Sequence, residues 1–457
     1  MTSMFLLFYY FFYFFILNMK KLIQLKLKIL AKIILAKYKP DIIGITGSVG
    51  KTSSKEAIYT VLASKFSARK NIKNYNNEIG APLTVIGSES PGKSILGWFF
   101  VFWKALKLIL IQDKNYPKIL ILEMGVDRPG DMDYLNKIAK SKTGVLTAIG
   151  PVHLEFFGTI ENIQKEKGKL IEALPKSGWA VLNYDDKKVM RIARLSKAKI
   201  LTYGFNSGAG VRARELVFNF SNLNEPKESM AGKLAGISFK ISHNNSSANI
   251  LLPNVIGRAA VYAALSAAAV GIAYGLNLTE IAEALSEFKS PTGRMNLIPG
   301  IKNTLIIDDT YNSSPQSLAS ALDMLNKIPL ASGARKFAVL GDMLELGSVS
   351  EEEHRKAGRL VFESGIDKLI VVGERSRDIA GGAEKAGMLP DNIFHFAAAG
   401  DAGKFIQDRI NEGDLILIKG SQGMRMEKIV KEIMSEPLRA KELLVRQGEE
   451  WIAARNA

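Results

Sequence analysis

Short apolar runs alternate with amphipathic stretches along most of the chain. The run DIIGIT at 41–46 is apolar and rich in β-branched residues, which is typical of a buried strand, and a helical pattern follows it from residue 53. Further strand patterns occupy 179–183, 216–220 and 237–241, and an Ala-rich helical pattern occupies 258–272. Strands that alternate with helices usually form parallel sheets, so we expect an α/β protein.

The alternation becomes regular from about residue 296. Five strand patterns follow one another with helical stretches between them, and they read TLIIDD, KFAVLG, KLIVVG, IFHFA and LILIKG. Such a βαβ series predicts a second, mostly parallel sheet. Residues 290–294 read SPTGR, where Pro and Gly suit a hinge. We therefore expect three parts, which are an N-terminal segment (1–40), a central domain (41–293) and a C-terminal domain (294–457).

The first residues of the chain have a different pattern. Residues 4–17 read MFLLFYYFFYFFIL and carry no charge. A spanning helix needs about 20 apolar residues, so this run is short for one. No Lys or Arg precedes it and no small-residue cleavage site follows it, so we do not expect a cleaved signal peptide. An alternative is that translation starts at Met19.

Residues 20–39 form a basic amphipathic pattern. They carry seven lysines and no acidic residue, with Leu and Ile at helical spacing. This composition is typical of a helix on an anionic membrane, although a helix packed on the next domain with solvated lysines would look the same. Residues 95–111 (ILGWFFVFWKALKLILI) allow the same two interpretations. We expect a cytoplasmic protein whose N-terminus contacts the inner face of the cell membrane.

Composition excludes several classes of protein. The chain has 457 residues, 47% of them apolar and 23% charged, so neither wholesale disorder nor a polytopic transporter fits. It has no cysteine, which excludes disulfides, thiolate metal sites and a cysteine nucleophile. The net charge of +16 suits anionic lipid or a phosphorylated substrate. Nucleic acid is not an expected partner, because the lysines lie among Leu and Ile rather than in an Arg-rich or aromatic groove.

A glycine-rich turn follows the first strand and carries the strongest local signal. Residues 47–52 read GSVGKT and precede a helical pattern. In a strand–loop–helix unit, glycines let backbone N–H groups surround phosphate oxygens, the Lys51 ammonium reaches the β- and γ-phosphates, and the Thr52 hydroxyl binds Mg²⁺. The strict pattern places glycine at 45, where this chain has Ile45. The candidate nucleotide-binding residues are Thr46, Gly47, Ser48, Val49, Gly50, Lys51 and Thr52.

Two further strand ends carry candidate chemistry. KILILE at 118–123 ends in Glu123, and ligands of open α/β sheets lie at the carboxyl ends of strands. Glu123 is therefore placed like a Mg²⁺ ligand, although a strand-end Glu is more often a solvated turn residue. GVLTAI at 144–149 leads to His153, one of four histidines, which is either structural or a cation ligand.

Seven motifs in order together resemble the Mur ligases. They are GITGSVGKTSSKE, NYNNEIGAPLT, LEMG, GPVHLEFFGT, IIDDTYNSSPQS, VLGDMLELG and LIKGSQGMRMEKIV, and they span roughly residues 41–435. Within that family, the chain is most similar to the ligase that adds D-alanyl-D-alanine to a muramoyl tripeptide. The resemblance implies a P-loop-type central ATPase domain followed by a Rossmann-like C-terminal domain. It also implies an amide ligase that uses ATP to form an acyl phosphate, which the incoming amine then attacks.

The resemblance implies roles for single residues. Thr52 and Glu123 would hold one Mg²⁺, His153 would help to hold a second, and Lys167 is the best match to a lysine that the family carbamoylates, with Lys165 and Lys169 as alternatives. Lys51, Glu123, His153 and Lys167 are therefore the candidate catalytic residues. The candidate nucleotide-binding residues outside the loop are Asn77, beside Asn76, and Arg294, Asp309, Tyr311 and Asn312, beside Pro315.

Two departures from the family affect the expected substrate. Family members begin with a domain that binds the UDP end of the substrate, whereas this chain reaches its phosphate loop by residue 44, after residues that are apolar or basic. Ala259, Ala260 and Ala263 stand where the family usually has His and Asn. The acceptor is therefore a UDP-linked muramoyl peptide, a lipid-linked muropeptide or a poly-γ-glutamate-like polymer, and a nucleotide-binding scaffold without turnover is a further alternative. We expect a monomer.

Overall fold

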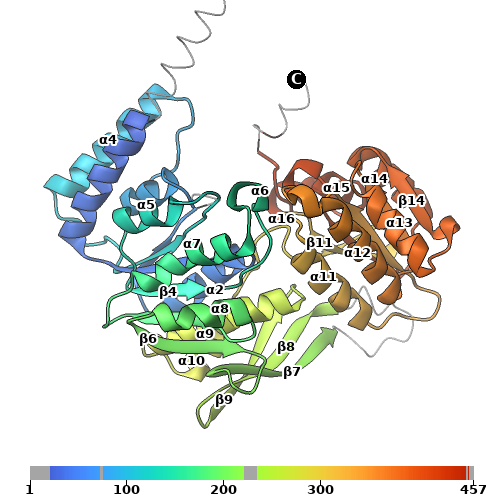
Figure 1. The fold of residues 1–457 in the computed structure, drawn as a ribbon, viewed down its shortest axis with the longest axis horizontal. Coiled ribbons are helices and arrows are strands. Elements are labelled where there is room, and N and C mark those ends of the chain that lie inside the picture. The colour runs from blue at the N-terminus through green and yellow to red at the C-terminus, as the bar shows by residue number, and fades with distance from the viewer. Residues whose placement is uncertain (1–20, 73–75, 221–233, 449–450, 452–457) are drawn as a thin grey trace, which may run out of the picture.

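The computed structural model describes residues 21–72, 76–220, 234–448 and 451 of the chain (Figure 1). It contains one nine-stranded and one six-stranded sheet, each with helices packed on it. We refer to the nine-stranded sheet and its helices as the first lobe and to the six-stranded sheet and its helices as the second lobe. The predicted run at residues 4–17 lies outside the described residues.

The first lobe is built on a sheet in the order β2-β3-β1-β4-β5-β6-β7-β8-β9. Its strands run parallel from β2 to β7, and β8 and β9 continue it as antiparallel neighbours. The strands are β1 (Asp41–Thr46), β2 (Ala68–Lys70), β3 (Ile119–Glu123), β4 (Thr143–Leu146), β5 (Trp179–Asn183), β6 (Lys199–Gly204), β7 (Val211–Phe220), β8 (Leu234–His243) and β9 (Ser246–Pro253).

Helices cover both faces of this sheet, because its central strands bury alternate residues in two different cores. Ile43 and Ile45 of β1 point into one core and Ile42 into the other. The helices are residues 21–38, α2 (Lys51–Ala63), α3 (Gly80–Ile86), α4 (Ile95–Leu110), α5 (Asp131–Ile138), α6 (Leu154–Phe157), α7 (Ile160–Glu172), α8 (Lys187–Ile192), α9 (Arg258–Ala273) and α10 (Leu278–Ser286).

The second lobe contains the predicted βαβ series. Its sheet has the order β10-β11-β15-β12-β13-β14, in which all neighbours run parallel except β10 and β11. Its strands and helices are β10 (Asn296–Pro299), β11 (Leu305–Asp309), α11 (Pro315–Lys327), β12 (Lys336–Gly341), α12 (Ser350–Glu363), β13 (Lys368–Val372), α13 (Arg377–Ala386), β14 (Ile393–Phe396), α14 (Ala399–Arg409), β15 (Leu415–Lys419), α15 (Glu427–Ile433) and α16 (Ala440–Leu443).

The sequence prediction of an α/β protein with mostly parallel sheets is confirmed, and two strands are longer than predicted. β8 spans Leu234–His243 rather than 237–241. β7 begins at Val211 rather than at residue 216. Glu215 has a positive φ of 55° and the register with β8 shifts between Arg214 and Val217. Such a bulge breaks the alternation of polar and apolar residues that marks a strand, which is why the sequence pattern revealed only its second half.

The N-terminal helix (residues 21–38) and α4 lie side by side and project from the first lobe (Figure 1). Leu27, Ala31 and Ile34 of the N-terminal helix are fully buried in the same core as Val101 and Ala105 of α4. The interpretation of this segment as a helix packed on the following domain is therefore correct for its inner face. None of the helices in the described ranges is both long and apolar enough to cross a bilayer.

Candidate functional site

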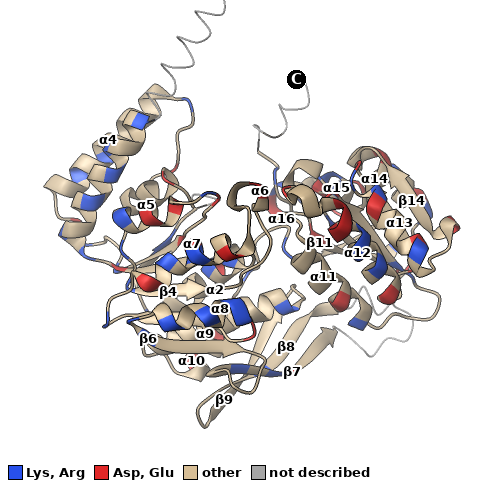
Figure 2. Cartoon of the chain, in the orientation of Figure 1, with Lys and Arg blue, Asp and Glu red and all other residues tan. Residues whose placement is uncertain are grey.

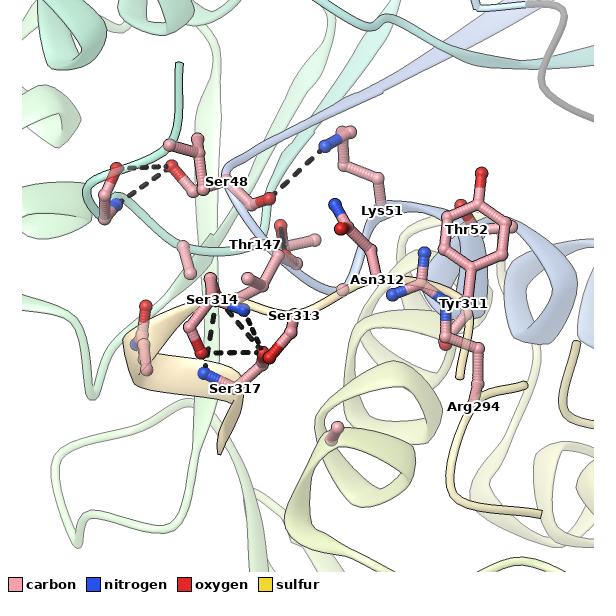
Figure 3. Close-up of a pocket in the computed structure, with 18 of the residues that line it drawn as sticks. Ser48, Lys51, Thr52, Thr147, Arg294, Tyr311, Asn312, Ser313, Ser314 and Ser317 are labelled. Carbon is pink, nitrogen blue, oxygen red and sulfur yellow. Dashed lines mark hydrogen bonds between the residues drawn. The ribbon is translucent and has the colours of Figure 1, made fainter. Parts of the chain in front are cut away.

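A cavity of about 970 Å³ lies between the two lobes. Its lining comes from the turns that follow β1, β3 and β4 in the first lobe and β11 and β15 in the second. These are carboxyl ends of parallel strands, where open α/β sheets bind their ligands. The predicted glycine loop and the predicted Asp309–Asn312 motif thus face the same space (Figure 3).

The glycine loop adopts a conformation that requires its glycines. Gly50 has a φ of 85° and precedes the first turn of α2, and Gly47 has a φ of 150°. A Cβ at Gly47 would lie 2.0 Å from Thr147 Oγ1, so a larger residue does not fit. Lys51 Nζ folds back and donates to Gly47 O at 2.8 Å. The loop therefore presents backbone N–H groups and an ammonium to the cavity, which is a suitable site for phosphate.

Side-chain hydrogen bonds fasten the loop to the neighbouring strands. Thr46 Oγ1 donates to Met124 O at 2.9 Å, and Ser48 Oγ both donates to Gly150 O and accepts from its N–H. Thr46 and Gly47 therefore support the loop from beneath. Of the predicted loop residues, those that line the cavity are Ser48, Val49, Gly50, Lys51 and Thr52.

The position of Lys51 lowers its proton affinity. Its pKa is lowered, first because burial disfavours the charged ammonium and then because of the nearby Arg294 guanidinium, while Glu123 opposes the shift. A phosphate bound between Lys51 and Arg294 would offset their two positive charges. The loop is therefore arranged so that a bound polyphosphate would stabilise the charged form of Lys51.

Glu123 lies at the end of β3 and forms a possible cation site with Thr52. Thr52 Oγ1 donates to Glu123 Oε1 at 3.2 Å, and Asn76 Nδ2 approaches the same oxygen at 3.4 Å. The buried Oε2 atom of Glu123 has no hydrogen-bond partner, although the Lys55 ammonium lies 3.7 Å away. A hydroxyl and a carboxylate with an unsatisfied buried oxygen fit Mg²⁺, which takes few protein ligands and completes its shell with phosphate oxygens and water.

His153 occupies a strained turn between the lobes. It has a positive φ of 53° at the start of α6. Its Nε2 atom lies 3.2 Å from Asp127 Oδ1, and its Nδ1 atom lies 2.8 Å from Glu345 Oε2 in the second lobe. Both ring nitrogens thus face carboxylates, so a cation at His153 would have to displace one of them. In the described part of the chain, no three His, Cys, Asp or Glu side chains are arranged to hold a metal ion.

The three candidate lysines of α7 have different environments. Lys165 is exposed, and Lys169 pairs with Asp133 at 2.6 Å and Glu166 at 2.7 Å. Lys167 is buried, and its pKa is lowered well below the usual value by desolvation and then by the Lys51 charge. A buried amine that readily loses its proton is nucleophilic toward CO₂, so Lys167 is the member of this group whose environment suits carbamoylation.

The second lobe brings an ion pair and an aromatic contact to the cavity. Lys419 Nζ donates to Asp309 Oδ2 at 2.6 Å and to Asn312 O at 2.9 Å. The Arg294 guanidinium stacks over the Tyr311 ring at 4.0 Å from its centroid (Figure 3). These residues come from three segments, so the ion pair holds the loop after β11 to the end of β15 and the stack holds it to the 290–294 stretch.

Some residues differ from the sequence expectation or were missed by it. Asn76 lines the cavity, whereas the Asn77 side chain accepts from the N–H groups of Ile79 and Gly80 and so caps α3. Pro315 is the first residue of α11. Ala259, Ala260 and Ala263 line the cavity.

The sequence reasoning did not single out Asp127, Asp185, Glu345 or Trp451, which also line the cavity. The position of Asp127 shortly after β3 could have indicated that it lines the cavity.

Two family models match the chain. The model described as "Mur ligase middle domain" matches residues 104–271, and the one described as "Mur ligase, glutamate ligase domain" matches residues 293–422. The chain is 30% identical to the UDP-N-acetylmuramoyl-tripeptide–D-alanyl-D-alanine ligase of Bacillus subtilis over 409 residues, which are 90% of this chain and 79% of that protein. It is 27% identical to the enzyme of the same name from Escherichia coli over 393 residues, 85% of this chain and 76% of that protein.

Solved structures agree with these matches. The MurF ligase of Thermotoga maritima in complex with ADP has a TM-score of 0.71 and 26% identity, covering 91% of this chain and 84% of that one. MurF of Acinetobacter baumannii has a TM-score of 0.72 and 25% identity, covering 89% of this chain and 79% of that one. The arrangement of the sheets around the cavity is therefore that of known ATP-dependent ligases.

Proposed function

The chain belongs to the Mur ligase family, and we propose that it is the ATP-dependent, ADP-forming ligase that joins D-alanyl-D-alanine to a muramoyl-peptide precursor of peptidoglycan. The observation that carries the proposal is the cavity between the lobes, where a phosphate-binding loop from one lobe faces the Asp309–Asn312 motif of the other. The two ligases from Bacillus subtilis and Escherichia coli named above carry this activity in their names.

The reaction has two steps that this cavity can separate in time. A carboxylate of the acceptor peptide attacks the γ-phosphorus of ATP, which yields an acyl phosphate and ADP. The amine of D-alanyl-D-alanine then attacks the acyl carbon, phosphate leaves and the amine loses a proton. A free carboxylate is unreactive toward amines because its leaving group would be oxide, and phosphorylation removes that obstacle.

The residues of the loop would bind the triphosphate. Ser48, Val49 and Gly50 present backbone atoms to it, and the Lys51 ammonium would leave Gly47 O to bind the terminal phosphate. The ammonium then offsets the charge that builds up when a carboxylate approaches a phosphate. On the other side, the Arg294–Tyr311 stack and Asn312 would hold the nucleoside end.

Mg²⁺ would be held by Thr52 Oγ1 and Glu123, whose unsatisfied Oε2 atom supports this position. When bound, the ion draws charge from the β- and γ-phosphates. His153 would reach a second cation only after Asp127 or Glu345 moves away. The buried Lys167 amine would add to CO₂ and lose a proton, and the resulting carbamate would be an oxygen ligand near Lys51.

We also propose that the chain divides into a central domain (41–293) and a C-terminal domain (294–457). The two sheets lie on either side of the SPTGR stretch, which supports a hinge there. Movement about this hinge would bring Asp309 and Lys419 toward the loop and exclude water from the acyl phosphate. The Glu345–His153 contact would then be made and broken with each cycle.

The acceptor is either UDP-linked or lipid-linked. The exposed apolar side chains of α4 favour the second possibility, because they would bring the enzyme to a membrane that holds lipid-linked precursors. We place the protein in the cytoplasm, where ATP is available, with the N-terminal segment on the inner face of the membrane. The basic residues at 20–39 and the uncharged residues at 4–17 support this placement.

The test is ADP formation by the purified full-length protein with ATP, Mg²⁺ and D-alanyl-D-alanine, using UDP-muramoyl tripeptide or lipid-linked muropeptide in parallel. ADP and ligated peptide with either acceptor support the ligase and identify its substrate. Bound nucleotide without ADP release under any combination would instead indicate a non-catalytic scaffold. Turnover only with a glutamate polymer would contradict the proposed substrate while leaving the chemistry intact.

A further inference from the structure

The helix pair formed by residues 21–38 and α4 exposes apolar side chains that nothing in the described chain covers. On α4, Ile95 is 86% exposed, Phe100 65% and Trp103 59%. Other large apolar side chains on the pair are also exposed, namely Leu22, Leu25, Ile29, Ile33, Leu96, Phe99, Leu106, Leu110 and Ile111. We call this set the helix-pair surface. Soluble proteins rarely leave so many large apolar residues together on adjacent helices without a partner.

The apolar positions follow the helical repeat on each helix. On the N-terminal helix, Leu22, Leu25, Ile29 and Ile33 are three or four residues apart and share one face, while Leu27, Ala31 and Ile34 of the opposite face are fully buried. On α4, the fully buried Ala105 and the nearly buried Val101 and Leu108 form the inner stripe in the same way. Both helices therefore have an inner face in the first lobe and an outer apolar face.

The two helices are fixed to each other. Lys37 Nζ donates to Leu108 O and Ile109 O at 2.9 Å and to Ile111 O at 3.0 Å, and Tyr38 OH donates to Leu108 O at 3.0 Å. Because the last turn of one helix binds the last turn of the other, the helices run in the same direction. Their first turns therefore lie together at the opposite end of the pair (Figure 1).

The charges on the two helices of this pair have one sign. Residues 21–39 contain six lysines and α4 contains Lys104 and Lys107, and neither helix contains an acidic residue (Figure 2). Lys21, Lys26 and Lys32 are exposed on the same side as the apolar stripe of the N-terminal helix. Apolar side chains flanked by lysines complement a bilayer with anionic headgroups, where the rings enter the acyl region and the ammonium groups stay with the phosphates.

The sequence beyond the described residues continues this pattern. Residues 4–17, which precede the far end of the pair in the chain, carry no charge and consist almost entirely of Leu, Ile, Phe and Tyr. Ile95, Leu96, Phe99 and Phe100 lie in the first turns of α4 at that same end. The sequence that adjoins the start of the helix pair is therefore as apolar as the outer face of the pair.

We infer that the helix-pair surface docks on an anionic lipid bilayer, with the outer face of α4 inserted among the headgroups. The inference rests on the membrane placement in the proposed function and deepens it, because it assigns the contact to the folded first lobe, which would orient the enzyme. With both the N-terminal segment and the helix-pair surface on the membrane, the enzyme could not rotate freely about the N-terminal segment alone. The inference does not depend on the ligase activity.

The first test is flotation of the full-length protein with vesicles of phosphatidylcholine alone or with added phosphatidylglycerol, whose anionic headgroups attract polybasic surfaces. Wild type is expected to float with the anionic vesicles and to be released by salt. The double variant Phe100→Glu/Trp103→Glu is expected to lose at least about tenfold in vesicle partition. The matched control is Leu438→Glu, because Leu438 is 98% exposed in the second lobe. Unchanged melting temperatures check that each variant folds.

The second test separates α4 from residues 1–20, which could bind lipid by themselves. With Trp98, Trp179 and Trp451 replaced by Phe, Trp103 is the one remaining tryptophan, and vesicles with brominated acyl chains should quench its fluorescence. A chain that keeps Trp179 alone should not be quenched. Trp103 fluorescence that stays unquenched while the protein floats with the vesicles overturns the inference. A wild-type dimer that Phe100→Glu/Trp103→Glu converts to monomer, without lipid binding, would assign the surface to a second copy.

Discussion

His153 and Glu345 meet across the cleft, with His153 Nδ1 2.8 Å from Glu345 Oε2. Both residues have positive φ angles, 53° and 63°, so two strained turns from different lobes hold this contact. Such strain is usually kept where geometry matters for function. The pair therefore links the first lobe, which carries the glycine loop, directly to the second lobe.

Replacing Glu345 by Gln should weaken this link without removing the side chain. The glutamate is about half exposed, so we expect only a two- to fivefold loss in kcat/KM, in line with the roughly 0.2–1 kcal/mol of an exposed pair. Steady-state ADP formation measures it. Glu374→Gln is the control, since Glu374 is 80% exposed and pairs only within its own lobe. A loss above a hundredfold would mean that Glu345 contacts the reacting atoms.

Lys51→Ala should reduce ligation by at least about a thousandfold, because the terminal phosphate would lose its nearest cation in the cavity. ADP release in single-turnover mixing provides the measurement. Lys65→Ala serves as the control, because Lys65 is exposed and pairs with Glu280 far from the loop. Near-normal turnover of the Lys51 variant would show that the glycine loop does not hold the triphosphate.

Glu123→Gln tests the cation site. The amide keeps the size of the side chain but removes the negative charge, whose Oε2 atom lacks a hydrogen-bond partner. We expect the Mg²⁺ concentration for half-maximal activity to rise about tenfold or more. Titration of activity with Mg²⁺ gives this value, and Glu172→Gln on the exposed side of α7 should leave it unchanged. An unchanged Mg²⁺ requirement in the Glu123 variant would place the ion elsewhere.

Lys167→Met should abolish the response of the enzyme to CO₂. If the Lys167 amine is carbamoylated, wild-type activity falls in CO₂-depleted buffer and returns on adding bicarbonate. Lys165→Met, two residues away and exposed, should keep that response. Mass spectrometry of protein trapped with a methylating reagent would identify the modified lysine directly. Full activity of wild type without CO₂ would eliminate the carbamate from the mechanism.

Asp308 should make stability depend on pH. Burial raises its pKa from 3.8 to about 7, so between these values the folded chain keeps a proton that the unfolded chain releases. Stability therefore falls as pH rises through this window, by at most about 4 kcal/mol. Asp308→Asn keeps the acceptor for Thr310 and should remove the dependence. Urea unfolding at pH 5 and pH 8 checks this, and parallel profiles for both proteins would contradict it.

Sequence reasoning captured the elements whose signals are local. The glycine loop, the strand before it and the βαβ series each depend on residues that are neighbours in the chain, and they lie where the patterns put them. β7 was only half predicted because its bulge at Glu215 interrupts the alternation. Choosing between Asn76 and Asn77 required the position of α3, which the Asn77 side chain caps.

Contacts between distant segments could not be predicted from such patterns. Nothing in the sequence around Glu345 indicates that it faces His153, because this contact depends on how the two lobes meet. Likewise, the choice among the α7 lysines depends on burial, which Lys165, Lys167 and Lys169 do not reveal by spacing. For the N-terminal helix, the two interpretations of its pattern describe its two faces, one packed and one exposed.

The tight turn at Gly47 limits how this enzyme can change under drug selection. Replacing Gly47 by any other residue would place a Cβ 2.0 Å from Thr147 Oγ1 and 3.0 Å from the backbone of Ala148. Its φ also lies in a region that other residues rarely adopt. An inhibitor that draws its affinity from the backbone atoms of this turn would therefore face few escape mutations at its own contact point.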